Sequence, residues 1–456
     1  MGNARPTKPN PMDYTQITAD DERQMLATIG VATVEELFAP IPADQRLQRP
    51  LDIPPGCSEP ELLAELTALA RRNHGADELT CFLGCGAYDH FIPTIVDHLA
   101  MRGEFLTAYT PYQAEASQGT LQAFYEFQTM ICQLTGMDIA NASLYEGASA
   151  AAEAATMAIA ATGRKHVVIS RTCHPETVET LTTYASQQEM ETSTIAARDG
   201  LTDASALTAA LNDDVAAVVL QFPNFFGLLE DLPALIDAIH AAGALAIVSF
   251  DPLAAGVYRR PGDLGADIVV GEGQALGIPL QYGAPYLGFF AAREKFLRRM
   301  PGRMVGVGYD AQGRRGFSLV LQTREQHIKR ERATSNVCTN QGLMAMRAAV
   351  YMSAMGRKGL TEVANLCLDK AHYAAERITA IDGFSLRFTA PFFKEFVVQT
   401  DRDVAKVLAA CRKQNILAGV PLGRWFDDLS DCFTVAVTEK RTKQEIEALA
   451  KALAST

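Results

Sequence analysis

Several kinds of residue and motif are missing from this 456-residue chain, and each absence excludes a class of protein. The formal net charge is -12, and no run of Lys and Arg is interleaved with aromatic residues, which excludes a nucleic-acid-binding role. The N-terminus lacks the apolar core of a signal peptide, and the uncharged stretch 273–292 is interrupted by prolines and glycines. We therefore expect a cytoplasmic protein with no membrane role.

Motifs for metal binding and for several common chemistries are also missing. The nine cysteines are scattered, and Cys81 and Cys85, the closest pair, have no His or second Cys pair at zinc spacing. We expect no metal site, and cysteines that serve as small core residues in a reducing compartment. The sequence has no G-x-S-x-G, H-E-x-x-H or P-loop motif, so it lacks the residues that define esterases, zinc proteases and P-loop NTPases.

The composition that is present is that of a globular enzyme-sized chain, with 48% hydrophobic and 21% charged residues. Between residues 166 and 291, short β-branched runs alternate with amphipathic helical segments, which predicts a mostly parallel sheet covered on both faces. In such a sheet the loops at the carboxyl ends of the strands form the binding site. His174, Pro223, Asn224 and Asp251 fall on such loops. We divide the chain into an N-terminal segment (1–75), a large α/β domain (76–338) and a linking helix with a small α+β domain (339–456).

Two neighbouring predicted strands carry the frame of a cofactor site. The strand Ile247–Phe250 ends in Asp251, and Ile268–Val270 leads into the glycine-rich turn GEGQALG. Where pyridoxal phosphate (PLP) is held on a parallel sheet, the first strand supplies an Asp to the pyridinium nitrogen and a Schiff-base lysine follows the second. Gln274 stands in the place of that lysine, and no Lys occurs between Lys165 and Lys295. The frame is that of a PLP enzyme without its covalent attachment point.

Three further features each have a functional and a purely structural interpretation. The turn at 141–149 opens an Ala-rich helix, and its free N–H groups either bind a phosphate or merely begin the helix. Tyr88, Tyr109 and Tyr112 lie close together beside glycines, and they either line a pocket or pack at the surface. The basic segment 324–332 either binds an anion or is a solvated, ion-paired helix start.

Four long motifs give the chain a resemblance to a known family. They read FLGCGAYDHFIP, AYTPYQAEASQGTLQAFYEFQTMICQLTGMDIANASLYEGASAAAEA, PGRMVGVGYD and LQTREQHIKRERATSNVCTNQ. On these motifs the chain resembles the P-protein of the glycine cleavage system, glycine dehydrogenase (decarboxylating), and in particular subunit 1 (α) of enzymes divided into two chains. The resemblance extends from about residue 14 to residue 440.

The resemblance implies a fold-type-I, PLP-dependent transferase-like large domain and a small C-terminal α+β domain. It implies that glycine loses its carboxylate as CO2 and that the aminomethyl group passes to the lipoyl arm of H-protein. A protonated pyridine ring holds the carbanion that decarboxylation leaves. In the divided enzyme subunit 2 carries the PLP lysine, in an expected α2β2 assembly, and Gln274 agrees with this because a carboxamide cannot form a Schiff base.

By the resemblance, this chain contributes residues to the partner's site across the interface. The candidates are Tyr88, Tyr109, Tyr112, Gln118 and Gly119, followed by Thr334, Ser335 and Asn336, because hydroxyl and backbone donors suit a phosphate or a small carboxylate. Arg324 or Arg330 would supply positive charge for glycine or for an acidic face of H-protein. His174, Asp251 and Gln274 would be a vestigial cofactor frame, with Asp251 a relic or still a pyridinium partner. The alternative is a scaffold that only stabilises its partner; a standalone PLP decarboxylase would need a lysine at 274.

Overall fold

The N-terminal segment contains helices but has almost no core of its own. The computed structural model describes residues 17–49, 51–76, 78–282, 285–338 and 340–456, and it divides into units of residues 1–73 and 74–456. Helices α1 (Ala19–Ile29) and α2 (Glu59–Ala70) begin with capping boxes at Thr18 and Ser58, as their sequences predict. Among the described residues of this unit only Leu26 is buried, so its apolar side chains gain little from packing on one another.

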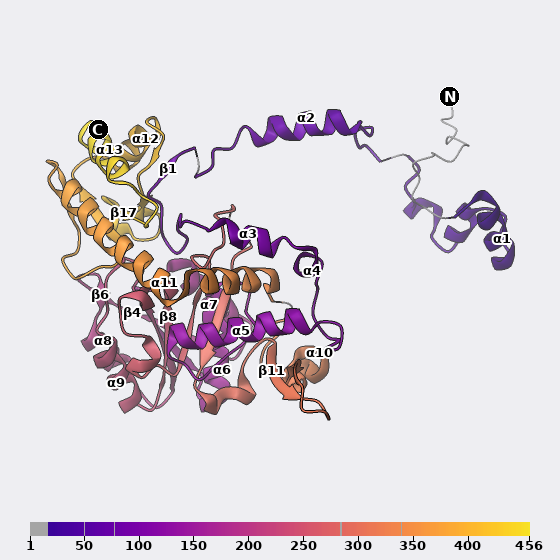
Figure 1. The fold of residues 1–456 in the computed structure, drawn as a ribbon, viewed down its shortest axis with the longest axis horizontal. Helices are drawn as coiled ribbons and strands as arrows, with labels where there is room; N and C mark the ends of the chain where they lie inside the picture. Colours follow the sequence, from indigo (N-terminus) through magenta and orange to yellow (C-terminus); the bar gives the residue numbers. More distant parts are fainter. Residues whose placement is uncertain (1–16, 50, 77, 283–284, 339) are drawn as a thin grey trace. The chain divides into compact units, whose positions relative to one another are not determined.

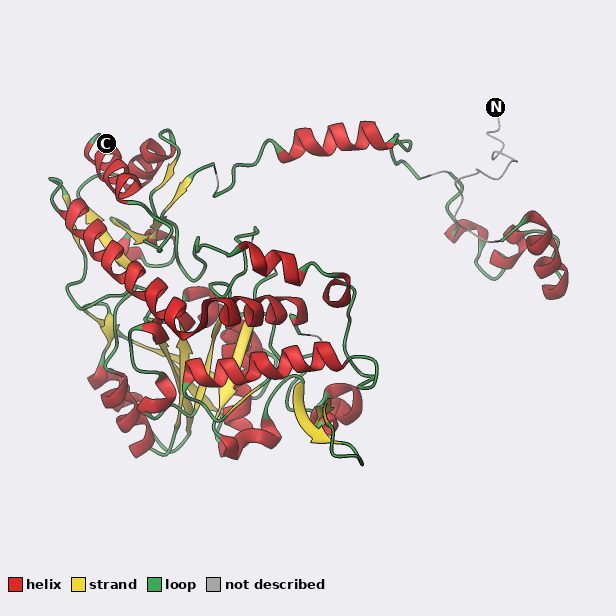
Figure 2. Cartoon of the chain, viewed as in Figure 1, coloured by secondary structure: helices red, strands yellow, loops and turns green. Residues whose placement is uncertain are grey.

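A seven-stranded sheet forms the centre of the second unit (Figures 1 and 2). Its strands, in spatial order, are β2 (Ile139–Ala140), β10 (Gly288–Ala292), β9 (Ile268–Glu272), β8 (Leu245–Phe250), β7 (Val215–Phe222), β3 (His166–Ser170) and β4 (Glu191–Ile195). The pairs from β9 to β4 are parallel, and β10 runs antiparallel to both of its neighbours. The mostly parallel sheet expected from the strand–helix alternation is therefore present.

The two faces of this sheet belong to two hydrophobic clusters. Along β7, Val218 and Leu220 contribute to one cluster, whereas Ala217 and Val219 contribute to the other, because successive side chains of a strand point to opposite faces. The first cluster includes residues of α5 (Gln118–Thr135), α8 (Ala204–Ala210), α9 (Leu232–Ala241) and α11 (Gly342–Thr379). The second includes residues of α6 (Gly147–Thr162) and α7 (Pro175–Ser186). Figure 1 shows α5 and α11 lying across the front of the sheet.

A hairpin that the sequence patterns did not lead us to expect follows β10 in the chain and packs against α5. Strands β11 (Met304–Tyr309) and β12 (Arg315–Val320) pair antiparallel, and β11 lies within the motif PGRMVGVGYD. The side chain of Asp310 accepts hydrogen bonds from the N–H groups of Gln312 and Arg314 and so stabilises the turn. Apolar residues alternate with small or polar residues on both sides of this turn, and this alternation is the sequence signal that would have predicted the hairpin. The short helix α10 (Gln326–Lys329) follows.

The C-terminal part is built on a four-stranded antiparallel sheet. Its order is β13 (Phe384–Leu386), β14 (Glu395–Thr400), β17 (Cys432–Ala436) and β16 (Val420–Pro421), with helices α12 (Val404–Arg412) and α13 (Lys443–Ala454). The long helix α11 leads into it and is kinked at Gly356, whose φ is 58°. Strand β1 (Thr80–Cys81) pairs with β15 (Ile416–Leu417), so the start of the second unit is joined to this part. Further short α-helices and strands are α3 (Thr94–Ala100), α4 (Gly103–Leu106), β5 (Ala197–Arg198) and β6 (Leu201–Thr202).

Across the described part of the chain, each helix is too short or too polar to cross a bilayer.

Candidate functional site

A cavity of about 200 Å³ lies at the carboxyl ends of the parallel strands. Its lining includes His174 after β3, Pro223 and Asn224 after β7, and Asp251 after β8. The strand–helix alternation predicted that these loops would meet at one edge of the sheet, and the structure brings all four residues to one cavity. The first turn of α6 and the segment Phe393–Glu395 complete much of the wall.

Gln274, at the place of the expected lysine, is fully engaged in hydrogen bonds. Its side chain is buried, and its Oε1 accepts from the backbone N–H of Tyr88 at 2.8 Å. Its Nε2 donates to the carbonyl oxygens of Tyr88 at 3.0 Å and Ile278 at 2.8 Å. The carboxamide thus joins the loop after β9 to the segment around Tyr88. It is a structural crosslink, and it offers no amine for a Schiff base.

Asp251, at the place of the pyridinium partner, is paired with a lysine of the chain itself. The Nζ of Lys394 lies 2.7 Å from Oδ2 of Asp251, and only 2% of the lysine side chain is exposed. The same ammonium lies 3.8 Å from the centre of the Tyr88 ring and 3.2 Å from Nε2 of His90. Asp251 also accepts from the N–H of Leu253 at 3.0 Å. A buried charge is tolerated when it is paired and hydrogen-bonded, and both members of this pair are.

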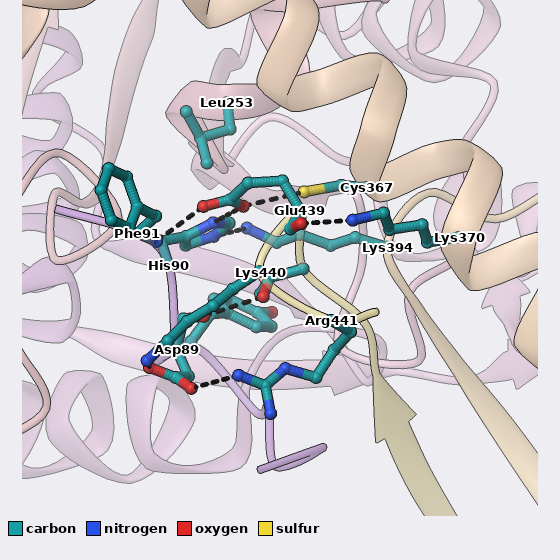
Figure 3. A network of polar contacts seen from close by, with 12 residues as sticks. Asp89, His90, Phe91, Leu253, Cys367, Lys370, Lys394, Glu439, Lys440 and Arg441 are labelled. Atoms are coloured by element: carbon teal, nitrogen blue, oxygen red, sulfur yellow. Dashed lines mark hydrogen bonds and ion pairs between the residues drawn. The ribbon is translucent and has the colours of Figure 1, made fainter. Parts of the chain in front are cut away.

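The pair continues into a polar network shown in Figure 3. Nδ1 of His90 lies 2.6 Å from Oε2 of Glu439, whose other oxygen accepts from the N–H of Phe91 at 2.6 Å. Burial opposes ionisation of Glu439, but the hydrogen bonds from His90 and from the N–H of Phe91 outweigh it and bring the pKa of Glu439 down to about 2. Cys367 lies near the same carboxylate, and Lys370 donates to the Glu439 carbonyl.

This network has the residue types of a metal site but the contacts of an internal ion-pair cluster. One ligand atom from each of His90, Cys367 and Glu439 lies within 4.8 Å of the others. The Lys394 ammonium, however, stands against the free nitrogen of His90, and a second cation adjoining a metal ion would repel it. Nearby, Asp89 pairs with Arg441 at 2.9 Å and with Lys440 at 2.8 Å. These contacts link the segment at 85–91 to the C-terminal part.

The N-terminus of α6 reaches the cavity, and carboxylates of the chain accept hydrogen bonds from two of its N–H groups. The N–H of Gly147 donates to Glu272 at 3.1 Å, and that of Ser149 donates to Glu146 at 2.8 Å. Glu272 also accepts from the N–H groups of Gln274 and Leu287. We expected the N–H groups of this turn either to bind a phosphate or merely to begin the helix. In this structure the N–H groups of Gly147 and Ser149 are bonded to side chains of the chain itself, as in an ordinary helix start. Burial raises the pKa of Glu272 to about 7, although the three N–H donors favour its charged form.

Glu272→Gln is expected to flatten the pH dependence of stability between about pH 4.5 and 7. The folded state raises the pKa of Glu272, so it binds a proton more tightly than the unfolded chain does, and stability falls as pH rises through this window. The loss attributable to Glu272 is on the order of 3 kcal/mol, and the neutral amide removes it. Urea unfolding of both proteins across this range measures the difference; parallel curves would show that Glu272 does not titrate with folding.

Tyr88 belongs to the cavity wall and does not project away from the molecule. Its hydroxyl donates to Oε2 of the buried Glu395 at 2.8 Å, and the N–H of Cys85 donates to Oε1 of Glu395 at 2.9 Å. Burial, together with the nearby Glu395 carboxylate, raises the pKa of Tyr88 well above its ordinary value, and burial also raises the pKa of Glu395. Tyr88 therefore serves as a neutral hydrogen-bond donor inside this chain.

The other candidate residues lie away from this cavity. Tyr109 is 78% exposed, and Tyr112 is half exposed and accepts a hydrogen bond from Arg303 at 2.9 Å. Gln118 joins the start of α5 to the hairpin by bonding the N–H and carbonyl of Phe317, while a Cβ on the neighbouring Gly119 would meet open space. Thr334 and Ser335 line a hollow of about 20 Å³, and Asn336 is exposed. The eight candidates thus do not form one site within this chain.

The structure gives Arg324 an internal role. Its guanidinium donates to the carbonyl oxygens of Leu321, Met300 and Gly302. Burial lowers the pKa of Arg324 from its ordinary value. Three of the five N–H donors of Arg324 thus serve the backbone of its own chain, whereas Arg330 is exposed.

The charged residues that decide the character of the cavity were missed by sequence reasoning. Lys394, Glu395 and Glu272 line it, and His90 and Glu439 support Lys394. A signal existed for the first two, since a Lys-Glu pair interrupts the apolar run PFFKEFVV at the start of β14. Charges in such a run are seldom buried unless they are paired.

The groups around the cavity do not fit covalently held PLP. Position 274 has no amine, Asp251 already holds a cation, and the helix N-terminus faces two carboxylates where PLP would bring a phosphate. The cavity keeps the outline of a cofactor site while its polar groups satisfy one another.

Comparisons with known proteins agree with the fold and with the motifs. The family described as Glycine cleavage system P-protein matches residues 12–453. Probable glycine dehydrogenase (decarboxylating) subunit 1 of Desulforamulus reducens is 50% identical over 442 residues, 97% of this chain and 99% of that protein. The protein of the same name from Geotalea uraniireducens is 51% identical over 443 residues, again 97% and 99% of the two chains.

Solved structures extend the likeness to three dimensions. A crystal structure of glycine decarboxylase (P-protein) of the glycine cleavage system, in inhibitor-bound form, matches with a TM-score of 0.90 and 42% identity, over 97% of this chain and all of that one. A Burkholderia pseudomallei sphingosine-1-phosphate lyase matches with a TM-score of 0.64 at 15% identity, over 91% and 94%, and shows the fold alone. The expected fold-type-I, transferase-like α/β architecture is confirmed. The chain belongs to the glycine cleavage system P-protein family.

Proposed function

We propose that this chain is the α subunit of a two-chain glycine dehydrogenase (decarboxylating) and that PLP is bound by subunit 2. Together the subunits would release the carboxylate of glycine as CO2 and pass the aminomethyl group to lipoylated H-protein. PLP supplies the electron sink for that decarboxylation. The observation that carries the proposal is the state of this chain's own cavity: Gln274 stands in place of the lysine, and Asp251 is paired with Lys394.

The contribution of this chain would then be made across the subunit interface. Tyr109 and Tyr112 are exposed, and Thr334, Ser335 and Asn336 lie on a loop beside exposed basic residues at 298–299 and 329–332. Hydroxyls and cations of this kind suit a phosphate or a small carboxylate on another molecule. Tyr88 is not part of this proposal, because its hydroxyl is used by Glu395. An α2β2 assembly and a cytoplasmic location are part of the proposal.

The experiment combines the purified chain with subunit 2, PLP and lipoylated H-protein, and measures visible absorbance and glycine–bicarbonate exchange. We expect no Schiff-base absorbance and no exchange from this chain alone, and both from the mixture. A Schiff base that borohydride traps on this chain alone would contradict the proposal, because another lysine would then hold the cofactor. Exchange by subunit 2 without this chain would contradict a role in the reaction.

The same assay distinguishes a shared site from the alternative, a scaffold that only stabilises its partner. Tyr112→Phe removes a hydroxyl while keeping the ring over Arg303. If Tyr112 completes the partner's site, kcat/KM for glycine falls by roughly tenfold or more in the assembled enzyme, with assembly unchanged. Tyr309→Phe, at a tyrosine that is also exposed, is the matched control. Equal activity of both variants and the unmodified enzyme would favour the scaffold.

A further inference from the structure

We propose that this cavity is closed to PLP by two charges of the chain itself, the ammonium of Lys394 and the carboxylate of Glu272, so that a lysine restored at position 274 would not restore cofactor binding. The inference rests on the proposed assignment of PLP to subunit 2. These two charges, and not the missing lysine alone, would prevent this chain from binding a second cofactor.

The first charge lies where the pyridinium ring would need its counter-ion. Lys394 is 2.7 Å from Oδ2 of Asp251, so the carboxylate that would hold a protonated ring nitrogen is already neutralised. A pyridinium that entered would meet a like charge at the position where it needs an opposite one. Lys394 thus removes the electrostatic reason for PLP to bind at this end.

Lys394 cannot readily move aside to make room. Its ammonium contacts Asp251, Nε2 of His90 and the face of Tyr88, and only 2% of its side chain is exposed. His90 is fixed in turn by Glu439. Displacing the ammonium would leave Asp251 unpaired in a largely buried position, which is costly.

The second charge lies where the phosphate would bind. Glu272 accepts the first N–H of α6 from Gly147, and Glu146 accepts the N–H of Ser149. The phosphate of PLP would carry a charge of about −1.5 to −2 to a place beside these two carboxylates. A Cβ at Gly147 would lie 2.9 Å from the backbone nitrogen of Glu272, so the first residue of α6 and the end of β9 are in direct contact.

The test restores the lysine with and without these charges, using the full chain. Gln274→Lys, Gln274→Lys/Glu272→Gln/Lys394→Met, and a control with Lys406→Met in place of Lys394→Met are incubated with PLP and reduced with borohydride. The incubation is at about pH 8.5, above the Glu272 pKa of about 7, so that the Glu272 carboxylate is charged. The side chain of Lys406 is 86% exposed and lies on α12, outside the cavity lining. PLP attached at residue 274 is then quantified by peptide mass spectrometry.

We expect the triple variant to carry roughly tenfold or more PLP at residue 274 than Gln274→Lys alone, with the control resembling the single variant. Equal labelling of the single and triple variants would overturn the proposal, because the missing lysine alone would then explain the lack of binding. A folded triple variant with no labelling at residue 274 would overturn it as well.

A second measurement decides the question if the triple variant does not fold. The unmodified chain is titrated with pyridoxine 5′-phosphate, which has the ring and phosphate but no aldehyde, in a calorimeter. We expect no saturable binding at concentrations up to about 1 mM, and saturable binding below that would overturn the proposal. Binding of pyridoxine 5′-phosphate to this chain would overturn the proposal about the cavity without changing glycine–bicarbonate exchange by the mixture with subunit 2. The two proposals can therefore fail separately.

Discussion

Replacing Lys394 with methionine is expected to lower the free energy of unfolding by about 3–5 kcal/mol. The change leaves Asp251 largely buried without its counter-charge, and it removes the ammonium from the ring of Tyr88 and from His90. Methionine retains most of the apolar stem, so the loss reports chiefly on the charge. Urea unfolding of the full chain, followed by circular dichroism, measures it.

The control for this variant is Lys406→Met. That lysine is 86% exposed and its nearest carboxylate oxygen, on Asp403, is 3.8 Å away, so the pair is screened by water. Its loss is expected to change stability by no more than about 0.5 kcal/mol. If the two variants were equally stable, the contact between Lys394 and Asp251 would not stabilise the fold, and its proposed role in the cavity would lose its basis.

Gly227→Ala is expected to destabilise the chain by roughly 2–5 kcal/mol, or to prevent folding. Gly227 has a φ of 82°, where an alanine costs roughly 1–2 kcal/mol. A Cβ at this position would also lie 1.8 Å from the carbonyl oxygen of Glu395, a backbone atom that cannot turn away as a side chain would. Relieving that overlap would require shifting β14 and the Lys394–Glu395 segment, and overpacking of this kind adds about 1–3 kcal/mol or more.

Gly163→Ala separates the two parts of this effect. Gly163 ends α6 with a φ of 73°, and a Cβ there would have no neighbouring heavy atom within 4 Å. Only the conformational cost of about 1–2 kcal/mol is then expected. Thermal unfolding of both variants gives the comparison. A Gly227 variant no less stable than the Gly163 variant would contradict the close approach of the two backbones.

Lys394→Met and Gly227→Ala both act where the segment Phe393–Glu395 meets the large sheet. Lys394 pairs with the end of β8, Glu395 accepts from Tyr88 and Cys85, and the N–H of Phe393 donates to the carbonyl of Gly227. A position that would serve a cofactor in a PLP enzyme here joins the C-terminal part to the sheet.

The sequence alone was sufficient for the features that depend on neighbouring residues. The alternation of β-branched runs with helical segments predicted the parallel sheet, and it placed His174, Asn224 and Asp251 on loops that the structure brings to one cavity. The caps at Thr18 and Ser58 were readable for the same reason, since a cap acts on N–H groups within its own first turn. Gln274 was recognisable because it follows the strand β9 by two residues, which is where a PLP enzyme would have its Schiff-base lysine.

Only the tertiary structure decided how the charges are paired. Lys394 and His90 are separated by 304 positions, and Glu439 and His90 by 349, so no local pattern connects them. Likewise β1 pairs with β15, a partner supplied by the far end of the chain. The composition showed a lysine, a histidine and several acids, but a charge becomes a counter-ion only when the fold removes it from water and brings an opposite charge within a few ångströms.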